Sequence, residues 1–142
     1  MTALAHRASR IARNSPDGRW IAYTSDASGR NEVYVQSYPT PDRRAIVSVG
    51  GGQHPAWRAD GRELYYWQDD RLIAARVDVV GGALVVRDRT PLFRARYPGG
   101  VVAMYDVAPD GNRFALVRGA ERSNRLVFVL DAVRGQGGGD GW

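Results

Sequence analysis

The sequence predicts an all-β fold built from three copies of one antiparallel strand unit. Three similar phrases, "SPDGRWIAYTSD", "RADGRELYYWQD" and "APDGNRFALVRG", place Asp-Gly pairs at 17–18, 60–61 and 110–111. Runs with the composition of β-strands follow each pair, and no segment shows a sustained apolar period of about 3.6 residues. Strand units repeated along one chain predict that these units stack side by side to bury their faces.

The Asp-Gly pairs have the chemistry of tight turns. Glycine adopts positive φ without a steric penalty, and an aspartate carboxylate accepts hydrogen bonds from the backbone of its own turn. Pro16 and Pro109 precede two of the pairs and fix φ there. We therefore interpret six residues as structural turn residues and not as catalytic ones: Asp17, Gly18, Asp60, Gly61, Asp110 and Gly111.

Four strands are expected in each of the first two repeats. In the first repeat, a weak opening strand precedes predicted strands at 20–25, 32–37 and 44–49. The second repeat has predicted strands at 54–57, 63–67, 71–79 and 83–86, with a further piece at 90–95. The third has predicted strands at 103–107, 113–117 and 125–131. Several are apolar on both faces, with Tyr65 and Trp67 on one side and Leu64 and Tyr66 on the other, which is typical of a sheet covered on both sides. Four strands in repeats spaced 43 and 50 residues apart are typical of propeller blades. The predicted fold is a partial β-propeller of about three antiparallel four-stranded blades, the third incomplete.

The repeats also resemble a known family. The phrases "SPDGRWIAYTSDASGRNEVYV" and "GGQHPAWRADGRELYYW" resemble the TolB-like, WD-repeat-like β-propeller repeat, in which a proline, an aromatic residue and Asp-Gly precede an aromatic strand. Departures from the pattern are Asn14 at the first aromatic position, Ala59 in place of proline and Val107 at the third aromatic position. Together the pieces are also similar to the propeller tail that follows some bacterial serine/threonine kinase domains.

This resemblance implies an organisation of the chain. It covers about 14–133 and implies blades at about 14–49, 54–95 and 101–133. A poorly matched segment, 1–13, precedes them, and a Gly-rich flexible tail, 134–142, follows. Propellers close with about 4 to 8 blades, so three blades leave two faces to be covered. The chain therefore closes with copies of itself, closes with another chain, or is a fragment of a larger propeller, and we favour the fragment because a ring of two wedges needs a head-to-tail contact that happens to close.

Composition excludes several classes of protein and site. The chain has no cysteine, which excludes disulfides, thiolate metal sites and a cysteine nucleophile. All 20 basic residues are arginine and the net charge is +5, but they are scattered among 15 acidic residues, which argues against a nucleic-acid groove. No apolar run approaches the roughly 18 residues of a membrane span, and the start lacks the apolar middle of a secretory signal. As given, the chain is expected to be cytoplasmic.

No catalytic, metal or cofactor motif is found. The histidines are His6 and His54, and neither a Gly-x-Ser-x-Gly elbow nor the His-Arg-Asp and Asp-Phe-Gly triplets of kinases occur. The loop "DASGRNE" at 26–32 lacks the alternating acids of a calcium loop. "GGGQHP" at 50–55 lacks the lysine of a phosphate-binding loop, and we interpret it as a flexible link between blades. We expect no enzyme activity and no cofactor.

One face of the predicted propeller is a candidate binding surface. Because hairpins alternate between the two ends of a blade, the Asp-Gly turns share one face, and the second-to-third strand loops share the other with the links between blades. A possible partner-binding loop face there comprises Arg30, His54, Arg71, Tyr97 and Arg122. The sequence thus predicts a non-enzymatic scaffold that binds a protein or peptide. The alternative is a detached sensory or regulatory propeller region of a bacterial serine/threonine kinase or of a prolyl-oligopeptidase-type enzyme.

Overall fold

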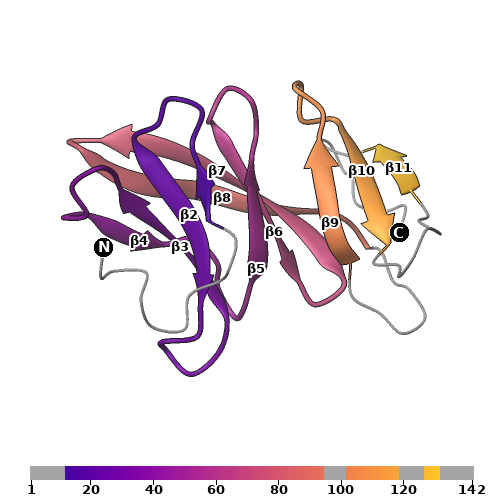
Figure 1. The fold of residues 1–142 in the computed structure, drawn as a ribbon, viewed down its shortest axis with the longest axis horizontal. Coiled ribbons are helices and arrows are strands. Elements are labelled where there is room, and N and C mark those ends of the chain that lie inside the picture. The colour runs from indigo at the N-terminus through magenta and orange to yellow at the C-terminus, as the bar shows by residue number, and fades with distance from the viewer. Residues whose placement is uncertain (1–11, 95–101, 119–126, 132–142) are drawn as a thin grey trace.

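The computed structural model describes residues 12–94, 102–118 and 127–131, and within these ranges every regular element is a β-strand. The strands form three antiparallel sheets in consecutive order along the chain (Figure 1). Blade 1 contains β1 (Arg13–Asn14), β2 (Trp20–Ser25), β3 (Glu32–Ser37) and β4 (Arg44–Ile46). Blade 2 contains β5 (Gln53–Trp57), β6 (Glu63–Gln68), β7 (Arg71–Val80) and β8 (Ala83–Arg94). Blade 3 contains β9 (Val102–Val107), β10 (Arg113–Arg118) and β11 (Val127–Asp131).

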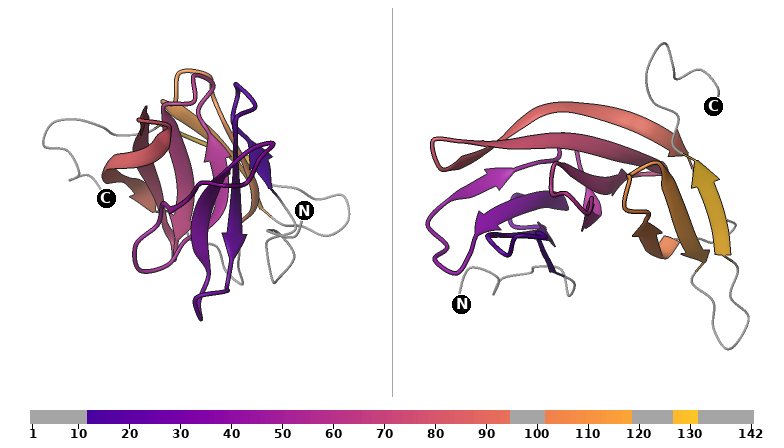
Figure 2. Two further views of the ribbon diagram at one scale, coloured as in Figure 1. Left: turned by 90° about the vertical axis from the view of Figure 1, so that its left-hand side faces the viewer. Right: turned by 90° about the horizontal axis from the view of Figure 1, so that it is seen from above.

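The arrangement is that of a partial propeller, as the sequence predicts. Each sheet is a meander in which consecutive strands pair, and the third has three strands in the described part of the chain. The three sheets stand side by side, so blade 2 has a neighbour on each face (Figures 1 and 2). The weakly matched opening strand of blade 1 is present but short, with Asn14 opposite Ile21.

The two-sided pattern of blade 2 builds two separate cores. Leu64 and Tyr66 pack toward blade 1, whereas Tyr65 and Trp67 pack toward blade 3. Toward blade 1 they meet the alternate residues of β2 and β3, namely Trp20, Ala22, Val33 and Val35. Period-two alternation therefore assigns each strand residue to one interface or the other, which is why the strands are apolar throughout.

Blades 2 and 3 meet through a cluster of aromatic rings. Phe114 is fully buried, and its ring centroid lies 4.9 Å from that of Tyr65 and 5.5 Å from that of Phe93. Both ring pairs are close to perpendicular, at 85° and 68°, the edge-to-face geometry that aromatic rings favour. Phe114 is thus the main described anchor of blade 3 on blade 2.

The outer hairpin of blade 2 is much longer than its counterpart in blade 1. β7 and β8 contain 10 and 12 residues, whereas β3 and β4 contain 6 and 3. The two pieces expected at 83–86 and 90–95 form one continuous strand with irregular register opposite Ile73 and Val77. This arm passes over the outer edge of blade 1 (Figure 2). There Arg89 Nε donates to the Val47 carbonyl at 2.7 Å.

The link between blades 1 and 2, residues 47–52, is called the glycine link. It is held by hydrogen bonds, whereas the sequence predicts a flexible segment at 50–55. The strand expected at 44–49 stops at Ile46, and the chain then turns so that the Val47 N–H binds the Val33 carbonyl at 2.8 Å. The Gly51 N–H and the Ser48 hydroxyl both donate to the buried Glu32 carboxylate. These hydrogen bonds tie the link to blade 1, because Glu32 is the first residue of β3 and is held in the blade 1 sheet by pairing with β2.

Candidate functional site

The three Asp-Gly turns have the same geometry. Gly18, Gly61 and Gly111 have φ values of +76°, +76° and +72°. In each turn the aspartate carboxylate accepts the backbone N–H two residues later, at 3.0, 2.9 and 2.9 Å. The first strand of each sheet leads into this turn, so all three turns lie at the same end of the blades. We call this end the turn face.

Asp17 has an additional partner in the first turn. The Ser15 hydroxyl donates to its carboxylate at 2.7 Å and accepts the Trp20 N–H at 3.1 Å. The backbone N–H of Arg19, followed by this hydroxyl, holds the pKa of Asp17 below its usual value. The first turn is therefore tied to the strand that carries Trp20.

A pH effect on stability follows from this arrangement. Because the pKa of Asp17 is lowered in the folded protein, its ionised carboxylate stabilises the fold above the ordinary value of 3.8, and this contribution is lost as pH falls through the folded-state pKa. As the pH falls below about 4, we expect the free energy of unfolding to decrease more for wild type than for Asp17→Asn. The difference should be under about 1 kcal/mol, because the site is exposed. Urea unfolding at pH 7, 4 and 3 measures it, with Asp69→Asn as the control. Identical pH profiles for wild type and Asp17→Asn would contradict the assignment.

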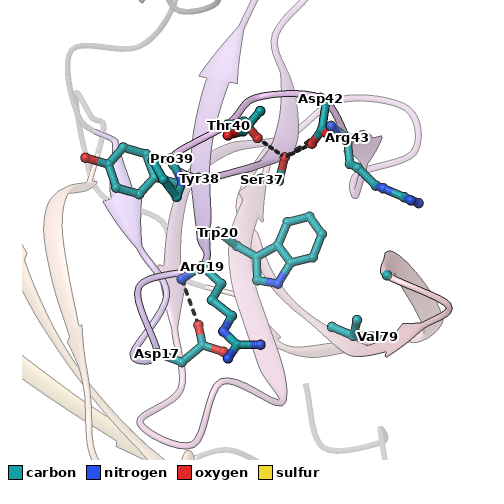
Figure 3. Close-up of a pocket in the computed structure, with 11 residues that line it drawn as sticks. Asp17, Arg19, Trp20, Ser37, Tyr38, Pro39, Thr40, Asp42, Arg43 and Val79 are labelled. Carbon is teal, nitrogen blue, oxygen red and sulfur yellow. Dashed lines mark hydrogen bonds between the residues drawn. The ribbon is translucent and has the colours of Figure 1, made fainter.

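A hollow of about 640 Å³ opens on the turn face beside Trp20 (Figure 3). It lies between the first Asp-Gly turn, the β3–β4 loop of blade 1 and the tip of the β7–β8 arm of blade 2. We call it the outer hollow; its lining is Asp17, Arg19, Trp20, Ser37, Tyr38, Pro39, Thr40, Asp42, Arg43, Val79 and Gly82. In Figure 3 Trp20 lies between Arg19 and Arg43, with Val79 across from Tyr38. The long arm of blade 2 thus supplies a wall that blade 1 alone lacks.

The β3–β4 loop that lines the outer hollow is held by its own hydrogen bonds. The Ser37 hydroxyl lies 2.5 Å from the Thr40 carbonyl and 3.0 Å from an Asp42 carboxylate oxygen, and it accepts the Arg43 N–H at 3.1 Å. The Tyr38 N–H donates to the Arg19 carbonyl at 2.9 Å, which joins this loop to the first turn. The outer hollow therefore has fixed backbone walls and side chains that project from them.

Two smaller hollows continue from the outer one toward the inner strands. The middle hollow, of about 410 Å³, shares Asp17, Trp20 and Val79 with the outer hollow and reaches the second turn. The inner hollow, of about 220 Å³, shares Pro16 and Trp57 with the middle one. The three hollows thus adjoin along the junction of blades 1 and 2, and we call them together the turn-face groove.

The opposite end of the blades contains part of the loop face that the sequence predicts. Arg30 lies in the β2–β3 loop with its Nε 3.0 Å from the Glu32 carboxylate. The next residue, Asn31, donates to the Gln53 side chain at 3.3 Å, so this loop contacts the link between blades. About two thirds of the Arg30 side chain, 65%, remains exposed, and its charge is already paired.

The other predicted loop-face residues differ in accessibility. His54 is half-buried in β5, where burial, followed by the nearby positive charge of Arg13, lowers its pKa. Arg71 begins β7 next to Gln68, whose amide donates to the carbonyls of the glycine link. Arg30, His54 and Arg71 are therefore gathered at one end of blades 1 and 2. Tyr97 and Arg122 lie outside the described residues, and the binding role of this face stays a prediction.

Sequence reasoning missed the turn-face groove. Its walls come from three segments distant in the chain, and only their packing reveals the hollow. A partial signal exists in the unequal hairpins, because 71–94 is long enough to reach beyond its own blade and turns at Gly81 and Gly82. In the described ranges, no three histidine or acidic side chains gather to form a metal site, and no helix that could cross a membrane occurs.

Comparisons with known proteins agree with the predicted resemblance. No protein-family model matches the chain. A protein named TolB homolog from Chlorobium luteolum (strain DSM 273 / BCRC 81028 / 2530) is 28% identical over 125 residues, which cover 86% of this chain and 26% of the relative. The chain thus spans about a quarter of the length of that relative. The crystal structure of TolB from Acinetobacter baumannii is 19% identical with a TM-score of 0.42, over 85% of this chain and 40% of that one. The match to the TolB homologue confirms, at low identity, the resemblance to the TolB-like repeat.

Proposed function

We propose that the chain is a non-enzymatic propeller scaffold that binds a protein or peptide segment in the turn-face groove. The observation that carries this proposal is the row of three adjoining hollows along the junction of blades 1 and 2, with hydrogen-bonded backbone walls and exposed apolar side chains at its rim. Loops held on a rigid scaffold are the common seat of binding sites. Closure of the propeller by copies of the chain or by further blades stays a prediction.

The rim of the groove has the chemistry of a protein-binding surface. Tyr38 and Val79 line the outer hollow with 47% and 51% of their surfaces exposed. Trp20 lies deeper with 8% exposed, so a bound side chain meets an aromatic surface at the centre of the hollow. Aromatic and arginine side chains are enriched where proteins bind one another.

A displayed peptide library tests the proposal. Twelve-residue random peptides on phage are selected against the full chain, and the affinities of the enriched peptides are measured for wild type and two variants. Val79→Glu places a charge at the rim of the groove, whereas Val49→Glu places the same charge at another exposed valine, in the link at the opposite end. We expect Val79→Glu to weaken binding roughly tenfold or more and Val49→Glu to leave it unchanged.

The matched valines separate the two candidate faces. Both side chains are at least half exposed, at 51% and 62%, so neither substitution removes a buried contact from the fold. Weakening by Val49→Glu alone would move the binding site to the predicted loop face. Failure to enrich any peptide that binds the folded chain would overturn the proposal as a whole.

A further inference from the structure

We propose that the outer hollow recognises an acidic segment, with Arg19 and Arg43 binding carboxylates of the bound chain on either side of Trp20. This inference rests on the proposed function, because it names the chemistry of the segment that occupies the groove. Among the described residues, the charged side chains of the hollow are two carboxylates and two guanidinium groups, Asp17, Asp42, Arg19 and Arg43. Their formal charges cancel, so the question is which of them are available to a partner.

Both carboxylates already have partners within blade 1. Asp17 accepts hydrogen bonds from the Ser15 hydroxyl and the Arg19 backbone N–H. Asp42 lies within hydrogen-bonding distance of the Ser37 hydroxyl, at 3.0 Å. Their lone pairs are therefore committed in part to the turn and the loop that form the walls of the outer hollow.

In the part of the chain that the structure describes, the two guanidinium groups lack such partners. Within the described residues neither Arg19 nor Arg43 forms an ion pair or a side-chain hydrogen bond, in contrast to Arg30, Arg58, Arg76 and Arg87. Arg19 attracts the Asp17 carboxylate, but only as a minor cause of its lowered pKa. Arg43 rests against the tip of the arm, since a Cβ built on Gly82 would lie 3.6 Å from its guanidinium carbon.

This combination favours carboxylates over other ligands. A guanidinium group offers a planar set of donors that binds a carboxylate with two parallel hydrogen bonds, and such charge-assisted bonds are stronger than neutral ones. Two such groups flank the apolar surface of Trp20 and Val79 (Figure 3). The hollow therefore matches a segment in which an acidic residue lies next to an apolar one.

The test uses the same peptide library and four arginine variants, three single and one double. We expect peptides enriched on wild type to contain Asp and Glu above their frequency in the library. Arg19→Gln and Arg43→Gln should each weaken binding of such a peptide about tenfold. Arg94→Gln, at an exposed position at the opposite end of β8, is the control and should leave the affinity unchanged. Replacing the acidic residues of the peptide by their amides should weaken its binding to wild type by a similar factor. The same replacement should weaken binding to the double variant, Arg19→Gln with Arg43→Gln, only slightly.

The outcomes separate this inference from the proposed function. If Val79→Glu weakens binding but Arg19→Gln and Arg43→Gln do not, the groove binds peptides and the acidic preference is wrong. Enrichment of peptides without acidic residues would lead to the same conclusion. If Arg94→Gln weakens binding as much as the two groove variants, the attraction comes from the overall positive charge and the inference is overturned.

Discussion

Replacing Phe114 by alanine is expected to lower the free energy of unfolding by about 3–5 kcal/mol, because it removes a fully buried aromatic side chain and leaves a cavity between two blades. The ring meets Tyr65 and Phe93 of blade 2, so the loss falls on this one interface. In stacked repeats each unit contacts only its neighbours, and the contact between blades 1 and 2 should survive. Urea unfolding followed by circular dichroism measures the total loss.

Hydrogen exchange locates where that stability is lost. Amide protection in β10 should fall in Phe114→Ala, while protection in β2 should stay close to that of wild type. Phe114→Leu, which keeps most of the volume, should cost less than about 1.5 kcal/mol. Asn112→Ala is the surface control, since Asn112 is an exposed turn residue. Equal loss of protection in β2 and β10 would show that the blades unfold as one unit and would contradict this expectation.

The strands and their two-sided burial were predictable because they depend on local patterns. Alternation along 63–67 assigns Tyr65 and Trp67 to one face and Leu64 and Tyr66 to the other, and the two cores divide the four residues in that way. Each Asp-Gly pair determines its own turn, because the glycine adopts positive φ and the aspartate carboxylate accepts a backbone N–H two residues later. Information of this kind is contained in short stretches of sequence.

The features that sequence reasoning missed depend on residues distant in the chain. Glu32 begins a strand and would be expected to face water, yet it is buried because Ser48 and Gly51 donate to it from the link. The outer hollow exists because the tip of the β7–β8 arm reaches the first turn and the loop that contains Arg43. Apart from the length of the hairpin at 71–94, no local pattern signals these contacts, so the groove appears only once the blades are packed.

Substituting the three turn glycines by alanine should give unequal losses of stability although their backbones are alike. Positive φ costs an L-residue about 1–2 kcal/mol at each site, since φ is +76°, +76° and +72° at Gly18, Gly61 and Gly111. An added Cβ meets nothing within 4 Å at Gly18 and lies 3.6 Å from Pro16 at Gly61. At Gly111 it would lie 2.5 Å from the Tyr65 hydroxyl oxygen, which adds about 1–3 kcal/mol of overpacking.

Gly18→Ala is therefore the internal control for Gly111→Ala, because it isolates the backbone cost from the contact. The contact itself is tested by adding Tyr65→Phe, which removes the oxygen that the new Cβ would meet. In the wild-type background Tyr65→Phe should cost about 1 kcal/mol, since the hydroxyl donates to Glu63 at 2.6 Å. In the Gly111→Ala background, Tyr65→Phe should lower stability less than in wild type, or raise it. Such a difference would measure an energetic coupling between blades 2 and 3. Equal losses at all three glycines, or no coupling with Tyr65, would mean that the third turn does not rest on blade 2, and the joined arrangement of blades 2 and 3 would be wrong.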